Sequence, residues 1–197
     1  SSPSARPAVY SVPLERGCAP SAVSRPHACS FTMPQRDYAQ HSNVRQSVAR
    51  EIGVTQDELC FLSALELRER YQRRELSPVE VTEAVLSRIE RLNPHLTAFI
   101  TVTAELALAQ AKAAEAAYAP GQTPGPLAGI PISIKDLTPT KGIRTTRGSL
   151  LYADWIPDED PPFVERVLAA GAVMLGKTNT PEFGWKGDSG NRLVGPT

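Results

Sequence analysis

The stretch PLAGIPISIKDL, residues 126–137, constrains the fold more than any other part of this chain. Its isoleucines stand at positions 130, 132 and 134, so a strand would carry them on one face and would carry Ser133 and Lys135 on the other. Lysine is seldom fully buried unless its ammonium is paired. The stretch therefore predicts an apolar strand whose terminal lysine needs either a partner or a reason to lose its charge.

The residues before this strand predict two helices. The sequence SALE at 63–66 has capping-box spacing and opens a helix that reaches about residue 75. A Ser-Pro pair at 77–78 opens the next helix, and the Asn-Pro pair at 93–94 is expected to end it. Four apolar residues of this second helix are spaced by four, four and three, and so predict one buried stripe: Val81, Val85, Ile89 and Leu92.

The remaining segments alternate between strand and helix. Residues 98–102 predict a short strand and residues 104–118 an alanine-rich helix. Pro162 can start another helix that Gly171 ends, after which AVML returns as a strand. We therefore expect an α/β fold with a mixed, largely parallel twisted sheet flanked by helices.

Lys135 stands where the apolar strand gives way to a polar, glycine-bearing loop, TPTKGIRTTRGS. Open α/β sheets bind ligands at such strand ends. From the strand alone, however, a lysine that leans into solvent is the simpler interpretation, and only a wider pattern can favour a functional one.

Composition narrows the range of partners and compartments. The chain has 21 basic and 21 acidic residues among 197, so no global field predicts a nucleic acid or an anionic membrane as partner. Cys18, Cys29 and Cys60 lie far apart and show neither metal-ligand spacing nor a disulfide framework, which favours a reducing, cytoplasmic location. No apolar run reaches the roughly 18 to 20 residues of a membrane span.

The two ends of the sequence differ from the middle. Residues 1–57 show no sustained periodicity, and we expect a disordered leader and linker, with a natural start at Met33. Residues 58–197 form the expected ordered domain. The last residues, NRLVGPT, stop on a turn with no closing element, which we interpret as an interruption of the fold.

Three segments in order carry a family pattern. They are the helix pair from residue 63, the block GIPISIKD with GIRTTRGS, and GAVMLGKTNTPEF. On these motifs residues 63–197 resemble the amidase signature family. The resemblance implies that the chain is the N-terminal part of that α/β domain, needs no cofactor or metal, and acts on a small-molecule amide.

Members of that family cleave amides, and some esters, with a nucleophilic serine, a second serine that has a cis peptide bond, and a lysine. By motif, Lys135 is the triad lysine. Burial between apolar neighbours would lower its pKa, so that the free amine could accept a proton through a hydroxyl relay. The family's serines lie in a segment of the type GGSSGG, which this sequence does not contain. We reject Ser133 as a substitute nucleophile and expect the 197-residue chain alone to be inactive.

Other polar residues receive more modest roles. Ser149 is a candidate for lining the substrate site or for hydrogen-bonding the proton relay, although loop serines usually satisfy turns. Lys177 is expected to be structural, because a second catalytic lysine would repel the first. A structural role is also expected for five further polar residues: Thr145, Thr146, Asn179, Glu182 and Asn191. Trp185 is expected to be a packing residue in a region near the pocket.

Three interpretations of function stay open. The first is a free-standing amidase that hydrolyses a small-molecule carboxamide. The second is the A-type subunit of a glutamyl-tRNA(Gln) amidotransferase, which resembles the same motifs but usually reads DEF with a Met-Gly-Ser-Ser continuation where this chain has PEFGWKGDSGN. The third is a catalytically incompetent truncated fragment. The substrate and the oligomeric state are not fixed by the sequence, and a homodimer is one option.

Overall fold

The computed structural model describes residues 55–197. The predicted start at Met33 and nearly all of the predicted leader lie outside these residues. The strands are β1 (Phe99–Val102), β2 (Pro131–Lys135) and β3 (Val173–Thr178). The helices are α2 (Gln56–Leu59), α3 (Ala64–Arg73), α4 (Pro78–Leu96), α5 (Ala104–Ala117) and α6 (Pro162–Ala169), with short 3-10 helices η1 (Leu150–Tyr152) and η2 (Glu182–Gly184).

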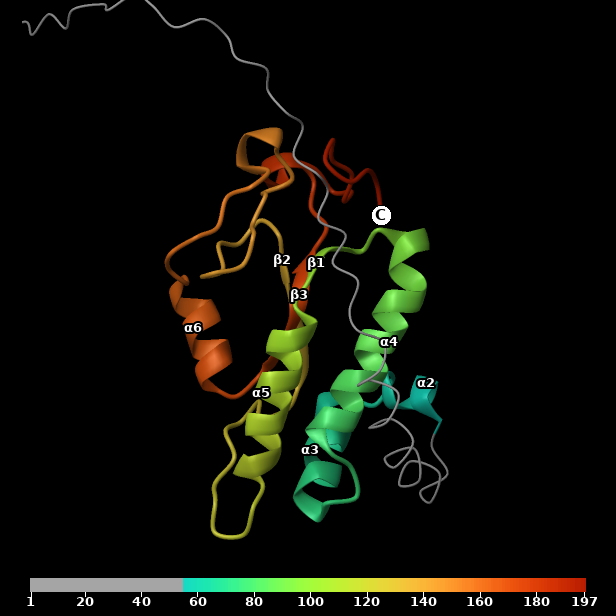
Figure 1. The fold of residues 1–197 in the computed structure, drawn as a ribbon, viewed down its shortest axis with the longest axis vertical. Coiled ribbons are helices and arrows are strands. Elements are labelled where there is room, and N and C mark those ends of the chain that lie inside the picture. The colour runs from blue at the N-terminus through green and yellow to red at the C-terminus, as the bar shows by residue number, and fades with distance from the viewer. Residues whose placement is uncertain (1–54) are drawn as a thin grey trace, which may run out of the picture. The chain divides into compact units, whose positions relative to one another are not determined.

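The three strands form one mixed sheet in the order β1-β3-β2. β3 pairs in parallel with β2 and antiparallel with β1. Helix α6 connects the parallel pair as the crossover helix, as predicted. Figure 1 shows α6 on one side of the strands and α4 on the other. The mixed α/β architecture expected from the sequence is therefore confirmed.

A one-residue bulge in β3 changes which side chains face each other. Ile132 pairs with Met174, but two residues later Ile134 pairs with Lys177, so β3 contains one extra residue between these points. Gly176 lies in the bulge with φ +149°, and a Cβ there would come within 2.1 Å of the Thr101 carbonyl oxygen. Bulges re-aim side chains beside functional sites. Here the bulge brings Lys177 to the same side of the sheet as Ile134.

Helix caps explain where the first helices begin. Ser63 and Ser77 each cap a helix with a complete capping box, as predicted. The expected end of α4 at Asn93-Pro94 is wrong, because the helix continues to Leu96 with Pro94 inside its last turn. A proline there removes only one hydrogen bond, and the Asn93 side chain bonds both main-chain groups of Phe99. Helix α2, with Thr55 as its cap, was not predicted.

Two apolar clusters hold α4 from different directions. Val81 and Ala84 pack with residues of α2 and α3, whereas Val79 and Leu86 pack with α5 and β3. The predicted single stripe is therefore too narrow, since Val79 and Leu86 lie outside it. A third cluster joins α6 to the opposite side of the strands through Val164, Ile134 and Met174. These layers fix β2 and β3 side by side.

Candidate active site

Lys135 is the last residue of β2, and its side chain is exposed. Ile134 and Asp136 are buried, whereas Ser133 is exposed like Lys135, so the predicted alternation of faces is confirmed. The expected burial of Lys135 between apolar neighbours is wrong for the described residues. Alternation assigns side chains to faces, but the cluster built with α6 covers only the face of Ile134.

On that covered face lies a buried charged pair. Nζ of Lys177 is 4.0 Å from Oδ1 of Asp136, and both side chains are 0% exposed. The bulge at Gly176 produces this arrangement, because it places Lys177 on the face that Asp136 shares with Ile134. Lys177 therefore lies on the opposite side of the sheet from Lys135, and its expected structural role agrees with this position.

The ammonium of Lys177 is fully hydrogen-bonded. It donates to the Thr138 carbonyl, to Oγ1 of Thr140 at 2.8 Å and to Oγ1 of Thr145 at 3.0 Å. Each threonine hydroxyl directs its own proton to a main-chain carbonyl, so both act as acceptors toward the lysine. Burial lowers the pKa of Lys177 to about 8, while the Asp136 carboxylate opposes this shift.

Asp136 ties three segments together. Its Oδ2 accepts hydrogen bonds from Thr146 N at 2.9 Å and Thr146 Oγ1 at 2.5 Å. Its own N–H donates to the Thr178 carbonyl at 2.8 Å, and its carbonyl accepts from Arg147 N at 3.0 Å. Burial raises the pKa of Asp136, and the bonds from Thr146 and the charge of Lys177 oppose this rise. The residue after Lys135 is thus fixed to β3 and to the following loop.

Two loops are joined beyond these strand ends. The N–H of Phe183 donates to the Arg147 carbonyl at 2.8 Å, and both residues have positive φ, +51° and +54°. Ser149 is buried, donates from Oγ to Oε1 of Glu182 at 2.7 Å, and caps η1 by accepting from Leu151 N. The structure therefore places Ser149 at this end of the sheet, with its hydroxyl bonded to protein groups.

Asn179 and Asn191 organise the residues after β3. The amide nitrogen of Asn191 donates to Oδ1 of Asn179 at 2.7 Å and to the Thr180 carbonyl at 2.8 Å. Oδ1 of Asn191 accepts from two main-chain N–H groups further on, those of Leu193 and Val194. These bonds agree with the supporting roles expected for both asparagines.

Sequence reasoning assigned no functional role to Arg147 or to the two aromatic residues near it. The guanidinium of Arg147 lies 4.8 Å from the centre of the Trp155 ring and 5.1 Å from that of Tyr152. All three residues fall within the short run TTRGSLLYADW, which has neither the helical nor the strand period. The only signal in the sequence for a contact between these residues was that they lie close together within that run.

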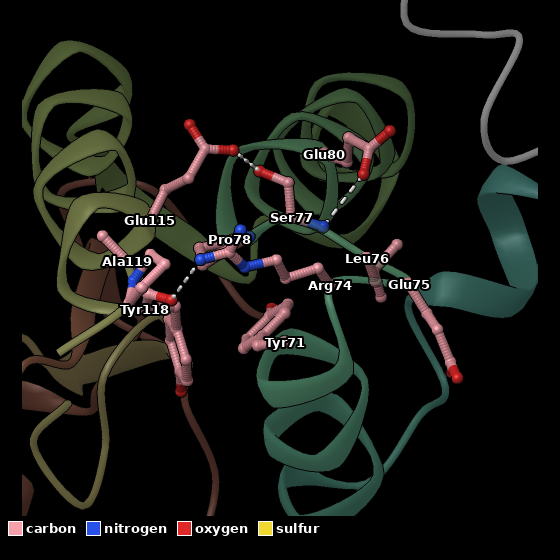
Figure 2. Close-up of a pocket in the computed structure, with 11 residues that line it drawn as sticks. Tyr71, Arg74, Glu75, Leu76, Ser77, Pro78, Glu80, Glu115, Tyr118 and Ala119 are labelled. Atoms are coloured by element: carbon pink, nitrogen blue, oxygen red, sulfur yellow. Dashed lines mark hydrogen bonds between the residues drawn. The ribbon is translucent and has the colours of Figure 1, made fainter. Parts of the chain in front are cut away.

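A cavity of about 540 Å³ lies at the other end of β2. Tyr71 and Tyr118 line it, and their hydroxyls donate to the carbonyls of Gly129 and Ala128, just before the strand begins. Figure 2 shows Arg74 reaching across this cavity to the Tyr118 carbonyl. Because its polar groups bond one another and Lys135 lies at the opposite end of β2, we do not assign the cavity to the candidate active site.

Comparison with known proteins decides the family. The family model described as Amidase matches residues 80–197. This chain belongs to the amidase signature family. The match includes both parallel strands, the buried pair between them and the loops beyond them.

Similar proteins include an amidotransferase subunit and two amidases. The chain is 46% identical over 140 residues to the A-type subunit of the glutamyl-tRNA(Gln) amidotransferase from Moorella thermoacetica, covering 71% of this chain and 29% of the relative. A bacterial aryl acylamidase of the amidase signature family has TM-score 0.65 and 29% identity, covering 71% of this chain and 29% of that one. The peptide amidase of Stenotrophomonas maltophilia has TM-score 0.57 and 36% identity, covering 61% and 25%. The chain thus spans less than a third of the length of these relatives.

Two further observations bear on other classes of site. Within residues 55–197, no group of three or more His, Cys, Asp or Glu side chains is placed to hold a metal ion. Over the same part of this amidase-family chain, no helix combines the length and the apolar character needed to cross a membrane.

Proposed function

We propose that this chain is part of an amidase that hydrolyses a small-molecule carboxamide to a carboxylate and an amine or ammonia. The observation that carries the proposal is the position of Lys135 at the carboxyl end of a parallel strand. The next residue, Asp136, is fixed to β3 and to the loop by four hydrogen bonds. A catalytic group needs such rigid support.

Lys135 is proposed to move the proton. As a free amine it would accept the proton of a serine hydroxyl through a second hydroxyl, and would return it to the departing nitrogen. The exposed position of Lys135 leaves its side chain free to meet those serines, which the family pattern places in a segment that this sequence does not contain. Packing of that segment over Lys135 would supply the desolvation that lowers a lysine pKa.

The test is a substitution in an enzyme that also carries the serine-bearing segment. Lys135→Ala should lower kcat for carboxamide hydrolysis by at least about 100-fold, the scale of a lost general base, without unfolding the protein. Lys112→Ala, at an exposed position of α5, is the matched control and should leave kcat unchanged. Turnover retained by Lys135→Ala would refute the assignment.

The 197-residue chain alone is proposed to be inactive, because no acyl-enzyme can form without the nucleophile. A fluorophosphonate probe, which labels activated serines, should leave this polypeptide unlabelled. Labelling of any serine in residues 55–197 would show that our view of the missing nucleophile is mistaken.

A second candidate function is that of the A-type component of an amidotransferase. It is supported by the 46% identity to the Moorella thermoacetica protein over 71% of this chain. The two candidates separate in one assay. A free-standing amidase should release ammonia from simple carboxamides without other proteins, whereas an amidotransferase component should need its partner proteins and respond to glutamyl-tRNA(Gln).

Two further points belong to the main proposal, in which a small-molecule amide is the partner. The first is that Ser149 lies near bound substrate, and the second is that the enzyme is cytoplasmic. The position of Ser149 in the loop after β2, where it bonds Glu182 beyond the end of β3, supports the first of these. The scattered cysteines support the second.

A further inference from the structure

The main chain of Arg147 is held on both sides by hydrogen bonds within the candidate active site. Its N–H bonds the carbonyl of Asp136, the residue after Lys135, and its carbonyl accepts from Phe183 on the second loop. Arg147 and Phe183 both have positive φ, although neither is glycine. Strain of this kind persists only where the surroundings impose it, and it is often found at ligand sites.

The guanidinium of Arg147 lies beside two aromatic rings and has a donor without an acceptor. The rings of Tyr152 and Trp155, with centres 5.3 Å apart, both lie within about 5 Å of the guanidinium carbon. A cation near an aromatic ring is attracted by the ring's quadrupole, and this attraction does not use up the N–H donors of the guanidinium. Nε of Arg147 is buried, and among the described residues it has no hydrogen-bond partner.

The acidic residues nearby do not satisfy this arginine. Glu182 accepts from Ser149, and Asp136 accepts from Thr146 and faces Lys177. None of the ion pairs within residues 55–197 involves Arg147. The site therefore holds an oriented cation whose buried edge lacks an acceptor.

We propose that Arg147, held between Tyr152 and Trp155, binds a carboxylate group of the substrate, so that the preferred substrate is a carboxamide that also bears a carboxylate. A planar fork of N–H donors matches the two oxygens of a carboxylate in bidentate fashion. One guanidinium balances one carboxylate charge, whereas a phosphate dianion would call for further cations. This inference rests on the proposed amidase function, because it names the substrate class of that site.

Binding can be measured on the 197-residue chain itself, without hydrolysis. Succinamate is the probe, and succinamide, in which a neutral amide replaces the carboxylate, is its control. In ¹⁵N NMR spectra of arginine side chains, the Nε–H signal of Arg147 should shift with succinamate and saturate with a Kd of about 1 mM, as for a single bidentate charge-assisted contact. It should not shift with succinamide. An unchanged signal, or equal shifts with both compounds, would overturn the proposal.

A substitution pair adds specificity to this test. Arg147→Lys keeps the charge but loses the planar fork, so it should weaken succinamate binding by about tenfold. Arg166→Lys makes the same change at an exposed position of α6 and should leave binding unchanged. Should Arg147→Lys fail to fold, the titration of the unsubstituted chain still decides the question.

Kinetics on the enzyme that carries the serine-bearing segment separates this inference from the proposed function. Arg147→Lys should raise KM for succinamate by about tenfold and change KM for succinamide by less than about twofold. Binding without any hydrolysis would leave the subsite in place and refute the amidase proposal. Lys135-dependent hydrolysis of succinamide, with no effect of Arg147→Lys on succinamate, would refute the subsite alone.

Discussion

Nζ of Lys177 lies 4.0 Å from Oδ1 of Asp136, with both side chains fully buried between β2, β3 and the loop that follows β2. Removing one charge of such a pair leaves the other buried without compensation, which costs about 3–5 kcal/mol. We therefore expect Lys177→Met to lower the free energy of unfolding by about that amount. Urea denaturation followed by circular dichroism measures it.

The matched control for this change is Lys112→Met on the exposed side of α5, which should alter stability by less than about 0.5 kcal/mol. The double variant Lys177→Met with Asp136→Asn should lose less than the sum of the two single losses, because it removes both charges together. Strict additivity would mean that the two groups do not interact.

The pKa of Lys177 gives a pH dependence with a definite sign. In the unfolded chain a lysine has a pKa of 10.5, and in the folded protein burial lowers this value to about 8. Between these values the unfolded state binds more protons, so the stabilising contribution of the neutral amine is fully present above pH 10.5 and is lost as pH falls through 8. Relative to Lys177→Met, the unsubstituted protein should gain about 2–3 kcal/mol between pH 8 and 10.

The titration itself can be followed by ¹³C NMR at Cε of Lys177. We expect a midpoint near 8. A midpoint at or above 10.5 would show that the three acceptors around the ammonium outweigh its desolvation. That result would also remove the expected gain in stability between pH 8 and 10.

The bulge in β3 is testable through its glycine. A Cβ at Gly176 would meet the Thr101 carbonyl oxygen at 2.1 Å, so Gly176→Ala should separate β1 from β3 and cost about 3 kcal/mol or more. Gly142→Ala is the matched control, because Gly142 also has positive φ but a Cβ there meets nothing within 4 Å. The control should lose only the strain of the backbone, about 1 kcal/mol. Equal losses in unfolding experiments would contradict the role of the bulge.

Sequence patterns predicted many of the helices and strands of this fold, but they could not predict which charged side chains are buried or paired. Capping boxes at Ser63 and Ser77 gave the starts of two helices, because caps depend on neighbouring residues only. The exposure of Lys135 could not be predicted in this way, since alternation indicates which residues share a face of the sheet and not which face is covered. The pairing of Lys177 with Asp136 depends on a single inserted residue, whose position is set by contacts with β1 and β2.

Ser149 allows a structural role to be separated from a role in substrate binding. Ser149→Ala removes the bond to Glu182 and the cap of η1 from a buried position, so the free energy of unfolding should fall by about 1–2 kcal/mol. Ser133→Ala, at an exposed position of β2, is the control and should change stability by less than about 0.5 kcal/mol. If Ser149 also contacts substrate, KM of the enzyme that carries the serine-bearing segment should rise severalfold. Lost stability with an unchanged KM would assign the hydroxyl wholly to joining the two loops.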